Sequence, residues 1–371
     1  MLISKSRTYE NIRIAMLWID ATGYALDSVS SIESILHDRL WSGFVGKTSS
    51  LSAPQYSHLK SCVYPENSAP YDISKAVIQT LEDFKPDVFI GAGWSITAIP
   101  QVAKAMRRLN IPTVCAADTP WLGTFRQTAR CLLGRRFIHS CYDAIMIPGA
   151  TGMPFAKLCG YNGQHIWYNM NTGDSLLFSR NTGQRLEVAR KEQVWPNQFV
   201  FVGRLVEEKN VRGLISAYEL YRKSVINPWP LVVIGDGPLR DLVKNVEKIE
   251  WKGWLEASEI SDILSKSGCF ILPSIYEPWG VVVHEACCSG LPLILSINTG
   301  AGADLLRDGF NGRYVDPNSP DHIASMMQWV ANHGKQWELG YNSYLLSNQF
   351  SPSLWSKNII SRSLELVNSS F

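Results

Sequence analysis

The sequence lacks an excess of charge of either sign, since 35 Lys and Arg residues stand against 33 Asp and Glu residues in a chain of 371. A chain so close to neutral has no broad basic surface for nucleic acid, and we expect no nucleic-acid partner. Hydrophobic residues make up 46% of the chain and charged residues 18%, a composition that is not typical of disordered proteins. The length favours two domains over one.

The eight cysteines include no C-x-x-C pair, and several lie in apolar runs such as GCFILP at 268–273 and EACCSG at 285–290. Cysteines in such runs are typical of buried free thiols in a reducing compartment, which argues against a disulfide framework or a zinc site. The seven histidines show no metal-ligand spacing, and no D-x-D motif follows a predicted strand. We therefore expect no bound metal and no cofactor.

The N-terminal sequence does not have the layout of a signal peptide. Its apolar run is shorter than the ~20 residues needed to cross a bilayer, so we expect a cytoplasmic location. The Walker P-loop and the G-x-S-x-G nucleophile motif are absent. Two G-x-G sequences, at Gly91–Gly93 and Gly300–Gly302, lack the third glycine of the dinucleotide-binding fingerprint, which weakens the case for a dehydrogenase.

Short apolar runs alternate with helical patterns along the whole chain. The runs are 12–19, 86–93, 111–117 and 142–149, and then 198–205, 229–238, 249–254, 268–274 and 291–297. This rhythm predicts an α/β protein with parallel sheets. Two doubly wound, Rossmann-like domains explain both series, and their ligands would bind beyond the carboxyl ends of the strands.

The polar stretch 179–197 interrupts this rhythm and is interpreted as a linker. The predicted domains are therefore 1–178 and 198–350. A last helix is predicted over 351–371, with Ser351 as its N-cap and Pro352 at its first position. This helix can pack back on the N-terminal domain.

The most specific motif is PSIYEPWGVVVHEACCSGLPLI at 273–294. Glu277 is predicted in a loop that follows a strand, and Glu285 about one and a half turns inside the helix that the loop opens. A helix N-terminus has free N–H groups and attracts phosphate. A carboxylate beside it is a strong double acceptor for sugar hydroxyls.

A second motif, FVFVGRLVEEKN at 199–210, places Arg204 and Lys209 after another strand. Two cations at this point can hold the phosphates of a nucleoside diphosphate. The alternative is a solvated loop in which Glu207 and Glu208 form local ion pairs.

Taken together, these segments resemble the retaining GT-B glycosyltransferases of family four. GRLVEEKN at 203–210 resembles the phosphate-binding segment of that family, VVIGDGPLRDLV at 232–243 the strand and helix after it, and Glu277 with Glu285 its paired glutamates. NTGAGADLLRDGFNGRYVDPNSPDHIA at 298–324 resembles the segment that closes the donor site, and GYNGQHIWYNMNTGDSLLF at 160–178 a stretch before the linker. The resemblance is nearly continuous from about 199 to 324.

The resemblance implies a GT-B architecture, with two domains facing a central cleft, and roles for particular residues. Arg204 and Lys209 would bind the donor diphosphate, Glu285 the ribose hydroxyls and Glu277 the transferred sugar. The implied donor-binding residues are Gly203, Arg204, Lys209, Glu277, Trp279, Gly280, Val281, Glu285 and Gly23. The implied catalytic residues are Glu277, Arg204, Lys209 and Asp118.

The N-terminal half departs from the family pattern in two places. Family members often have two adjacent glycines after the first strand, where this chain has only Gly23. They often have a histidine after a strand of the IPTV type, where this chain has Ala117 and Asp118. Asp118 either replaces that histidine or caps the turn that follows.

The resemblance implies a glycosyltransferase that moves a sugar from a nucleoside diphosphate sugar to an acceptor hydroxyl, with retention and without a metal. Such an enzyme serves the synthesis of a polysaccharide, glycolipid or other glycoconjugate. Two alternatives are an inactive binding partner of another glycosyltransferase and a nucleotide-sugar epimerase on the same fold. An inactive partner would be expected to lose Arg204 or Lys209, and both are present.

The stretch 104–137 holds seven Lys and Arg residues and one acid, Asp118. Arg126 and Arg130 share a helix face, with apolar Leu132, Leu133 and Phe137 close by. This pattern predicts a peripheral contact with an anionic membrane at its inner face, where the acceptor would be lipid-linked. The alternative is an ordinary solvated helix.

Overall fold

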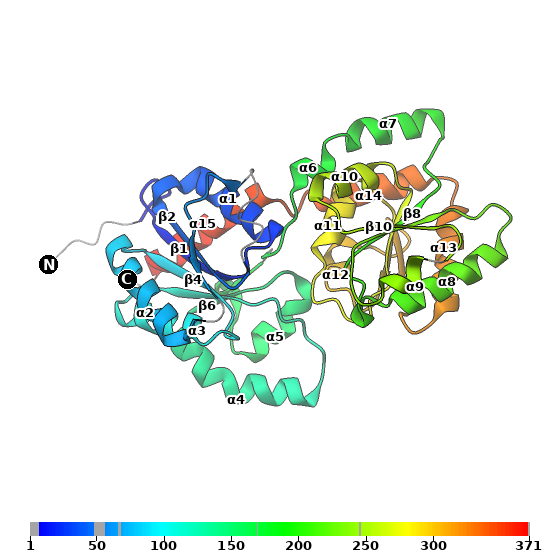
Figure 1. Cartoon of the computed structure of the whole chain (residues 1–371). Helices are drawn as coiled ribbons and strands as arrows, with labels where there is room; N and C mark the ends of the chain where they lie inside the picture. Colours follow the sequence, from blue (N-terminus) through cyan, green and yellow to red (C-terminus); the bar gives the residue numbers. More distant parts are fainter. Residues whose placement is uncertain (1–6, 48–55, 66–67, 169, 245, 370–371) are drawn as a thin grey trace. The chain divides into compact units, whose positions relative to one another are not determined.

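The computed structural model describes residues 7–47, 56–65, 68–168, 170–244 and 246–369, and Figure 1 shows their elements. The chain divides into two units, each with its own sheet. Residues 1–172 and 352–371 form the N-terminal unit, and residues 173–351 form the C-terminal unit.

The N-terminal unit contains a parallel sheet in the order β3-β2-β1-β4-β5-β6-β7. The strands are β1 (Ile14–Ile19), β2 (Leu40–Val45), β3 (Cys62–Tyr64), β4 (Val88–Ala92), β5 (Thr113–Ala116), β6 (Ala144–Met146) and β7 (Ile166–Trp167). The α-helices are α1 (Gly23–Leu36), α2 (Pro70–Phe84), α3 (Ala98–Arg108), α4 (Phe125–Cys141), α5 (Met153–Leu158) and α15 (Pro352–Ser369). The strand order reverses between β1 and β4.

The C-terminal unit contains a second parallel sheet, in the order β10-β9-β8-β11-β12-β13. The strands are β8 (Phe199–Val202), β9 (Leu231–Ile234), β10 (Ile249–Gly253), β11 (Cys269–Leu272), β12 (Leu293–Ser296) and β13 (Gly312–Val315). The α-helices are α6 (Ser175–Ser179), α7 (Thr182–Glu192), α8 (Val211–Ser224), α9 (Arg240–Lys244), α10 (Ala257–Ser265), α11 (Val281–Cys288), α12 (Gly302–Leu305), α13 (Pro320–Ala331) and α14 (Gln336–Ser347). The order reverses between β8 and β11, where a doubly wound sheet binds its ligand.

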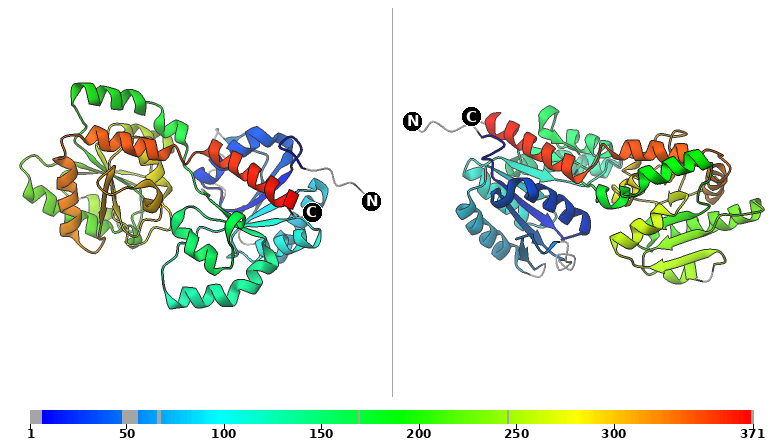
Figure 2. Two further views of the ribbon diagram at one scale, coloured as in Figure 1. Left: turned by 180° about the vertical axis from the view of Figure 1, so that it is seen from behind. Right: turned by 90° about the horizontal axis from the view of Figure 1, so that it is seen from above.

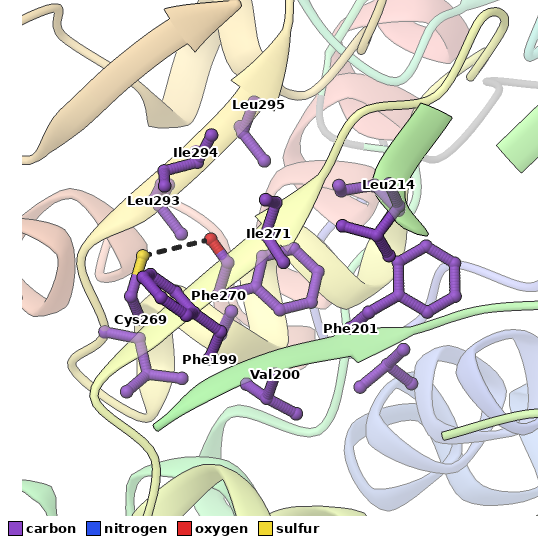
Figure 3. Close-up of a cluster of buried hydrophobic side chains, with 14 of the residues drawn as sticks. Phe199, Val200, Phe201, Leu214, Cys269, Phe270, Ile271, Leu293, Ile294 and Leu295 are labelled. Atoms are coloured by element: carbon purple, nitrogen blue, oxygen red, sulfur yellow. Dashed lines mark hydrogen bonds between the residues drawn. The ribbon is translucent and has the colours of Figure 1, made fainter. Parts of the chain in front are cut away.

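The central strands of the C-terminal unit form as predicted because they are apolar along their whole length. Every residue of β8, β11 and β12 is buried, as expected for parallel strands covered on both faces. Figure 3 shows Phe199, Phe201 and Phe270 packed with the aliphatic side chains of β11 and β12. This core fixes the two strand ends from which the motifs at 203–210 and 273–280 continue.

The stretch 179–197 is not a linker in the structure, because most of it is helix α7, which lies within the C-terminal unit. Its buried side chains, Thr182, Leu186 and Ala189, face that unit. Arg185 donates to the carbonyl oxygens of Gly290 (3.0 Å) and Ser289 at the C-terminal end of α11. The division between the units falls at 172–173 rather than at 178.

The last helix, α15, belongs to the N-terminal unit and packs against α1. Trp355, Ile359 and Ile360 on α15 are buried, and Ser356 Oγ donates to Ser31 Oγ at 2.9 Å. Figure 2 shows this helix in red beside the blue start of the chain. The helix therefore completes the N-terminal unit, although it follows the C-terminal unit in sequence.

Candidate functional site

In the C-terminal unit, the loops that follow β8 and β11 meet where the strand order reverses. The backbone N–H groups of Ile275 and Tyr276 donate to the carbonyl oxygen of Glu208, at 2.9 and 3.3 Å. Asn210, the N-cap of α8, donates through Nδ2 to Pro273 O (3.0 Å) and to Pro317 O (2.7 Å). Asn210 thus fixes the first loop against two others, a positioning role that the sequence motifs did not reveal.

Lys209 and Glu277, 68 residues apart in sequence, form an ion pair between these two loops. Lys209 Nζ donates to Glu277 Oε2, and the two side chains are only 16% and 9% exposed. Neither Glu207 nor Glu208 pairs with Lys209 within the described residues. Glu207 does form a local, exposed ion pair, with Arg212 at 3.2 Å, which leaves Lys209 to Glu277. Removing one partner of a buried pair leaves an uncompensated charge, which typically costs about 3–5 kcal/mol.

The loop that carries Glu277 is held by the loop after β12. Gly300 N donates to Glu277 O at 2.9 Å, and Ala301 N donates to Trp279 O at 2.8 Å. A Cβ at Gly300 would lie 2.0 Å from Pro278 O, so this glycine permits a close backbone approach. Trp279 is buried, and its ring lies 5.6 Å from that of Phe350. The loop is therefore fixed from both sides.

Gly280 lies at the N-cap of α11 with φ 94°, in the left-handed region that favours glycine. A Cβ there would lie 3.1 Å from Glu277 Cγ. No side chain caps this helix, so the N–H groups at its start, beginning at Val281, are suited to bind an anion. The N–H group of Val283 already donates to Gly280 O at 3.0 Å. The Lys209–Glu277 pair lies directly before this helix end.

Glu285 lies on α11 beside the backbone of Gly173, since a Cβ at Gly173 would come within 2.8 Å of Glu285 Cγ. The neighbouring His284 is buried and accepts a hydrogen bond at Nδ1 from Gly173 N (3.1 Å), while Nε2 lies 3.3 Å from Ser347 O. Burial lowers the pKa of His284 to about 4, which keeps the ring neutral. His284 thus holds the start of the C-terminal unit onto α11.

Arg204 lies two residues beyond the end of β8, after Gly203, and is exposed. No carboxylate of the described residues forms an ion pair with it. The backbone at Gly203 is fixed by the loop after β9, because a Cβ at Gly235 would lie 1.9 Å from Gly203 O. Leu205 N also donates to Asp236 O at 2.9 Å. The backbone around Arg204 is therefore rigid while its guanidinium group stays accessible.

The two remaining predicted site residues, Gly23 and Asp118, lie in the N-terminal unit. A cavity of about 390 Å³ there lies beyond the ends of β1, β4 and β5, and Asp118 lines it together with Asp20 and Tyr24. Gly23 is the first residue of α1, beside this cavity, and its carbonyl oxygen accepts a hydrogen bond from Tyr56 OH at 3.2 Å. The cavity occupies the point where the order of this sheet reverses.

Asp118 is exposed, and none of the described backbone N–H groups donates to its carboxylate. This geometry does not support the interpretation as a turn cap. The pKa of Tyr24 is raised by burial, with smaller contributions from the negative charges of Asp118 and Asp20. Asp20 was not singled out from the sequence, although a polar residue directly after a predicted strand is a usable signal.

Two features are absent from the part of the chain that the structure describes. The described residues contain no group of three or more His, Cys, Asp or Glu side chains placed to hold a metal ion. No helix among them is both long and apolar enough to span a bilayer.

Comparison with protein families identifies the C-terminal unit. Residues 186–344 match the model of the family Glycosyl transferases group 1, and this segment contains Arg204, Lys209, Glu277 and Glu285. The match lies within the C-terminal unit and confirms the resemblance to glycosyltransferases found in the sequence.

Two relatives have similar sequences over part of their length. An uncharacterized glycosyltransferase of Methanocaldococcus jannaschii is 28% identical over 200 residues, which is 51% of this chain and 47% of that protein. The O-antigen chain mannosyltransferase B of Escherichia coli is 28% identical over 178 residues, 46% of each chain. The chain thus spans about half the length of the curated relatives it matches.

Among solved structures, HepE of Anabaena in complex with UDP has a similar fold, with a TM-score of 0.74 at 16% identity. The match covers 94% of this chain and 99% of that one. At 16% sequence identity, this similarity is evidence for the fold alone. Two parallel-sheet α/β units together with this neighbour define a GT-B fold, so the fold class predicted from the sequence is confirmed.

Proposed function

We propose that this protein transfers a sugar from a nucleoside diphosphate sugar to an acceptor hydroxyl, with retention at the anomeric carbon. The observation that carries the proposal is the Lys209–Glu277 pair at the N-terminus of α11. It combines a cation, a carboxylate and free N–H groups at the reversal point of a doubly wound sheet. A solved relative in fold, HepE, has been crystallised with UDP and with UDP-glucose, which supports a nucleotide-sugar donor.

In this proposal the diphosphate lies against Lys209, Arg204 and the first N–H groups of α11. Glu277 accepts hydrogen bonds from hydroxyls of the transferred sugar, and Glu285 from the ribose. Gly203 and Gly280 allow the backbone to approach the donor closely. The backbone N–H groups around Trp279, Gly280 and Val281 face the diphosphate or the transferred sugar.

During transfer, the bond from the anomeric carbon to the β-phosphate oxygen breaks, and its electron pair stays on the phosphate. The acceptor oxygen forms the new bond on the same face, and its proton passes to the departing phosphate. The transition state has oxocarbenium character. Lys209, Arg204 and the helix terminus stabilise the charge that develops on the leaving group, which is the largest effect expected in such a site.

On the acceptor side, we assign the cavity at Asp118 and Gly23 to part of the acceptor or to the transferred sugar. Asp118 stands where the resembled family often has a histidine, and its carboxylate can accept a hydrogen bond from a hydroxyl. The acceptor is proposed to be a sugar or a lipid-linked sugar, in glycoconjugate synthesis on the cytoplasmic side of the membrane.

The proposal is tested by incubating the protein with UDP-, GDP- and ADP-sugars and following the release of nucleoside diphosphate. With an accepted donor, proton NMR of the product should show the anomeric configuration of the donor. An inverted product would contradict retention. Binding of a nucleoside diphosphate without turnover on any donor and acceptor would favour an inactive partner, and a changed sugar still joined to its nucleotide would favour an epimerase.

A further inference from the structure

Helix α4 presents large apolar side chains on the face that its own unit leaves uncovered. Cys131, Ile138 and Cys141 are the buried residues of this helix. In contrast, Phe125 is 87% exposed and Leu133 is 84% exposed. Leu132 and Phe137 are also exposed, as is Leu122 just before the helix.

These apolar residues share a face with three arginines. Phe125, Leu132, Leu133 and Arg136 follow the spacing i, i+7, i+8 and i+11, and Arg126, Arg130, Leu133 and Phe137 follow i, i+4, i+7 and i+11. Both series place their members on adjoining strips of one helix surface. We name the surface formed by Phe125, Arg126, Arg130, Leu132, Leu133, Arg136 and Phe137 the α4 surface.

The α4 surface carries positive charge that nothing in its helix neutralises. Helix α4 contains no acidic residue, and Arg126, Arg130 and Arg136 are exposed. No ion pair joins any of these three arginines to a carboxylate of the described residues.

Three other cations of the same stretch contact neighbouring groups. Arg107 pairs with Asp143 at 3.0 Å, and Arg135 lies against Gly160, where a Cβ would come within 2.2 Å of its Nε. Lys104 Nζ lies 4.8 Å from the centre of the Phe137 ring. Arg108 is exposed like the arginines of α4 but lies on α3, so Arg126, Arg130 and Arg136 are the exposed cations that share a face with the apolar residues of α4.

An apolar cavity of about 540 Å³ adjoins this surface. Arg126, Arg130 and Phe137 line it, together with Leu122, Ile138 and Phe155. No acidic residue is among its lining residues. Arg126 and Arg130 thus lie beside apolar side chains. Such a combination of cations and apolar groups suits a lipid with an anionic headgroup.

We propose that the α4 surface docks the N-terminal unit on an anionic lipid bilayer, with Phe125 and Leu133 entering the interface and the arginines at the headgroups. Nucleic acid would use the charge but not the exposed leucines and phenylalanine. This inference goes beyond the proposed sugar transfer and does not depend on it, because vesicle binding is measured without donor or acceptor.

Co-sedimentation with vesicles tests the proposal. The full chain should bind vesicles of phosphatidylglycerol and phosphatidylcholine at low salt and not vesicles of phosphatidylcholine alone. Changing Arg126→Ser, Arg130→Ser and Arg136→Ser together should weaken binding on the order of 100-fold, since each basic residue contributes about fivefold. Phe125→Ser with Leu133→Ser should weaken it as well, and both variants should keep the thermal unfolding temperature because the altered side chains are exposed.

The matched control removes three exposed cations elsewhere, by Lys60→Ser, Lys75→Ser and Lys223→Ser, and should bind like the unaltered protein. Absence of binding at low salt would overturn the proposal, and so would full binding by either α4 variant. If sedimentation without lipid shows a self-associated protein that only the α4 variants dissociate, the surface contacts a second copy instead of a membrane.

Discussion

At the scale of single residues, the two cations of the proposed donor site differ in what else they do. Lys209 belongs to a buried ion pair with Glu277, whereas Arg204 is exposed. Replacing Lys209 therefore removes a ligand contact and also leaves a buried carboxylate without its partner. Replacing Arg204 removes only the contact, so the Arg204 variant separates donor binding from stability.

Glu285→Gln should weaken donor binding and turnover roughly tenfold to a hundredfold, because one charge-assisted hydrogen bond contributes ~1.5–3 kcal/mol. Glutamine has nearly the size and shape of glutamate, so the close packing of residue 285 against Gly173 should be kept and the fold should persist. Donor affinity is measured by calorimetry and rate by diphosphate release. Glu219→Gln, an exposed substitution on α8, is the matched control, and equal behaviour of the two variants would remove Glu285 from the site.

At the scale of elements, His284 joins α11 to the first residue of the C-terminal unit. Its folded pKa of about 4 lies below the ordinary 6.5, so the unfolded chain binds the proton more readily. The stability that the neutral ring contributes is complete above pH 6.5 and is lost as the pH falls from 6.5 towards 4. The loss at the lower end is on the order of 3 kcal/mol, from about 1.4 kcal/mol per pH unit.

Urea unfolding between pH 7 and 4 measures this effect. His284→Gln keeps an acceptor for Gly173 N but does not titrate, so its stability should fall less steeply over that range, whatever its value at pH 7. His322→Gln, at an exposed histidine in the first turn of α13, should keep the original slope. Parallel curves for the unaltered protein and His284→Gln would show that this ring does not set the acid sensitivity.

The elements that could be predicted were those with a clear pattern. The runs at 198–205, 268–274 and 291–297 are β8, β11 and β12 because fully buried strands are apolar throughout. Strands β3 and β7 are short and gave no such signal. Helix α7 was interpreted as a linker from its polar composition, although Thr182, Leu186 and Ala189 repeat at i, i+4 and i+7 and mark its buried face.

The candidate site was predictable in part. Each motif showed that Lys209 and Glu277 follow a strand, but their pairing depends on β8 and β11 being neighbours, which strand order decides. The clamp by Asn210 and the close approach at Gly300 depend on the same loop contacts. The sequence shows which residues follow each strand, but the contacts between these loops depend on the order of the strands in the sheet.

At the scale of the whole molecule, the proposed chemistry uses side-chain cations and a helix terminus to stabilise the leaving group. Sugar transfer should therefore survive EDTA at the rate found without it. The measurement is diphosphate release with and without chelator, using enzyme that has first been dialysed against EDTA. Loss of activity that manganese or magnesium restores would show that a divalent ion is part of the reaction.

The chain has two units with separate sheets, and we assign the donor to the C-terminal unit, which contains the match to the family model. The assignment of the donor diphosphate to the loops after β8 and β11 is thus the central claim.

Calorimetric titration with UDP, GDP and ADP tests this claim most directly. The unaltered protein should bind at least one of them, Arg204→Ala should bind it roughly tenfold to a hundredfold more weakly with unchanged unfolding temperature, and the double variant with Lys209→Ala should show no binding. Arg212→Ala, at an exposed arginine paired with Glu207, should bind like the unaltered protein. Affinity in a folded double variant equal to that of the unaltered protein would contradict the account, because the diphosphate would then lie elsewhere.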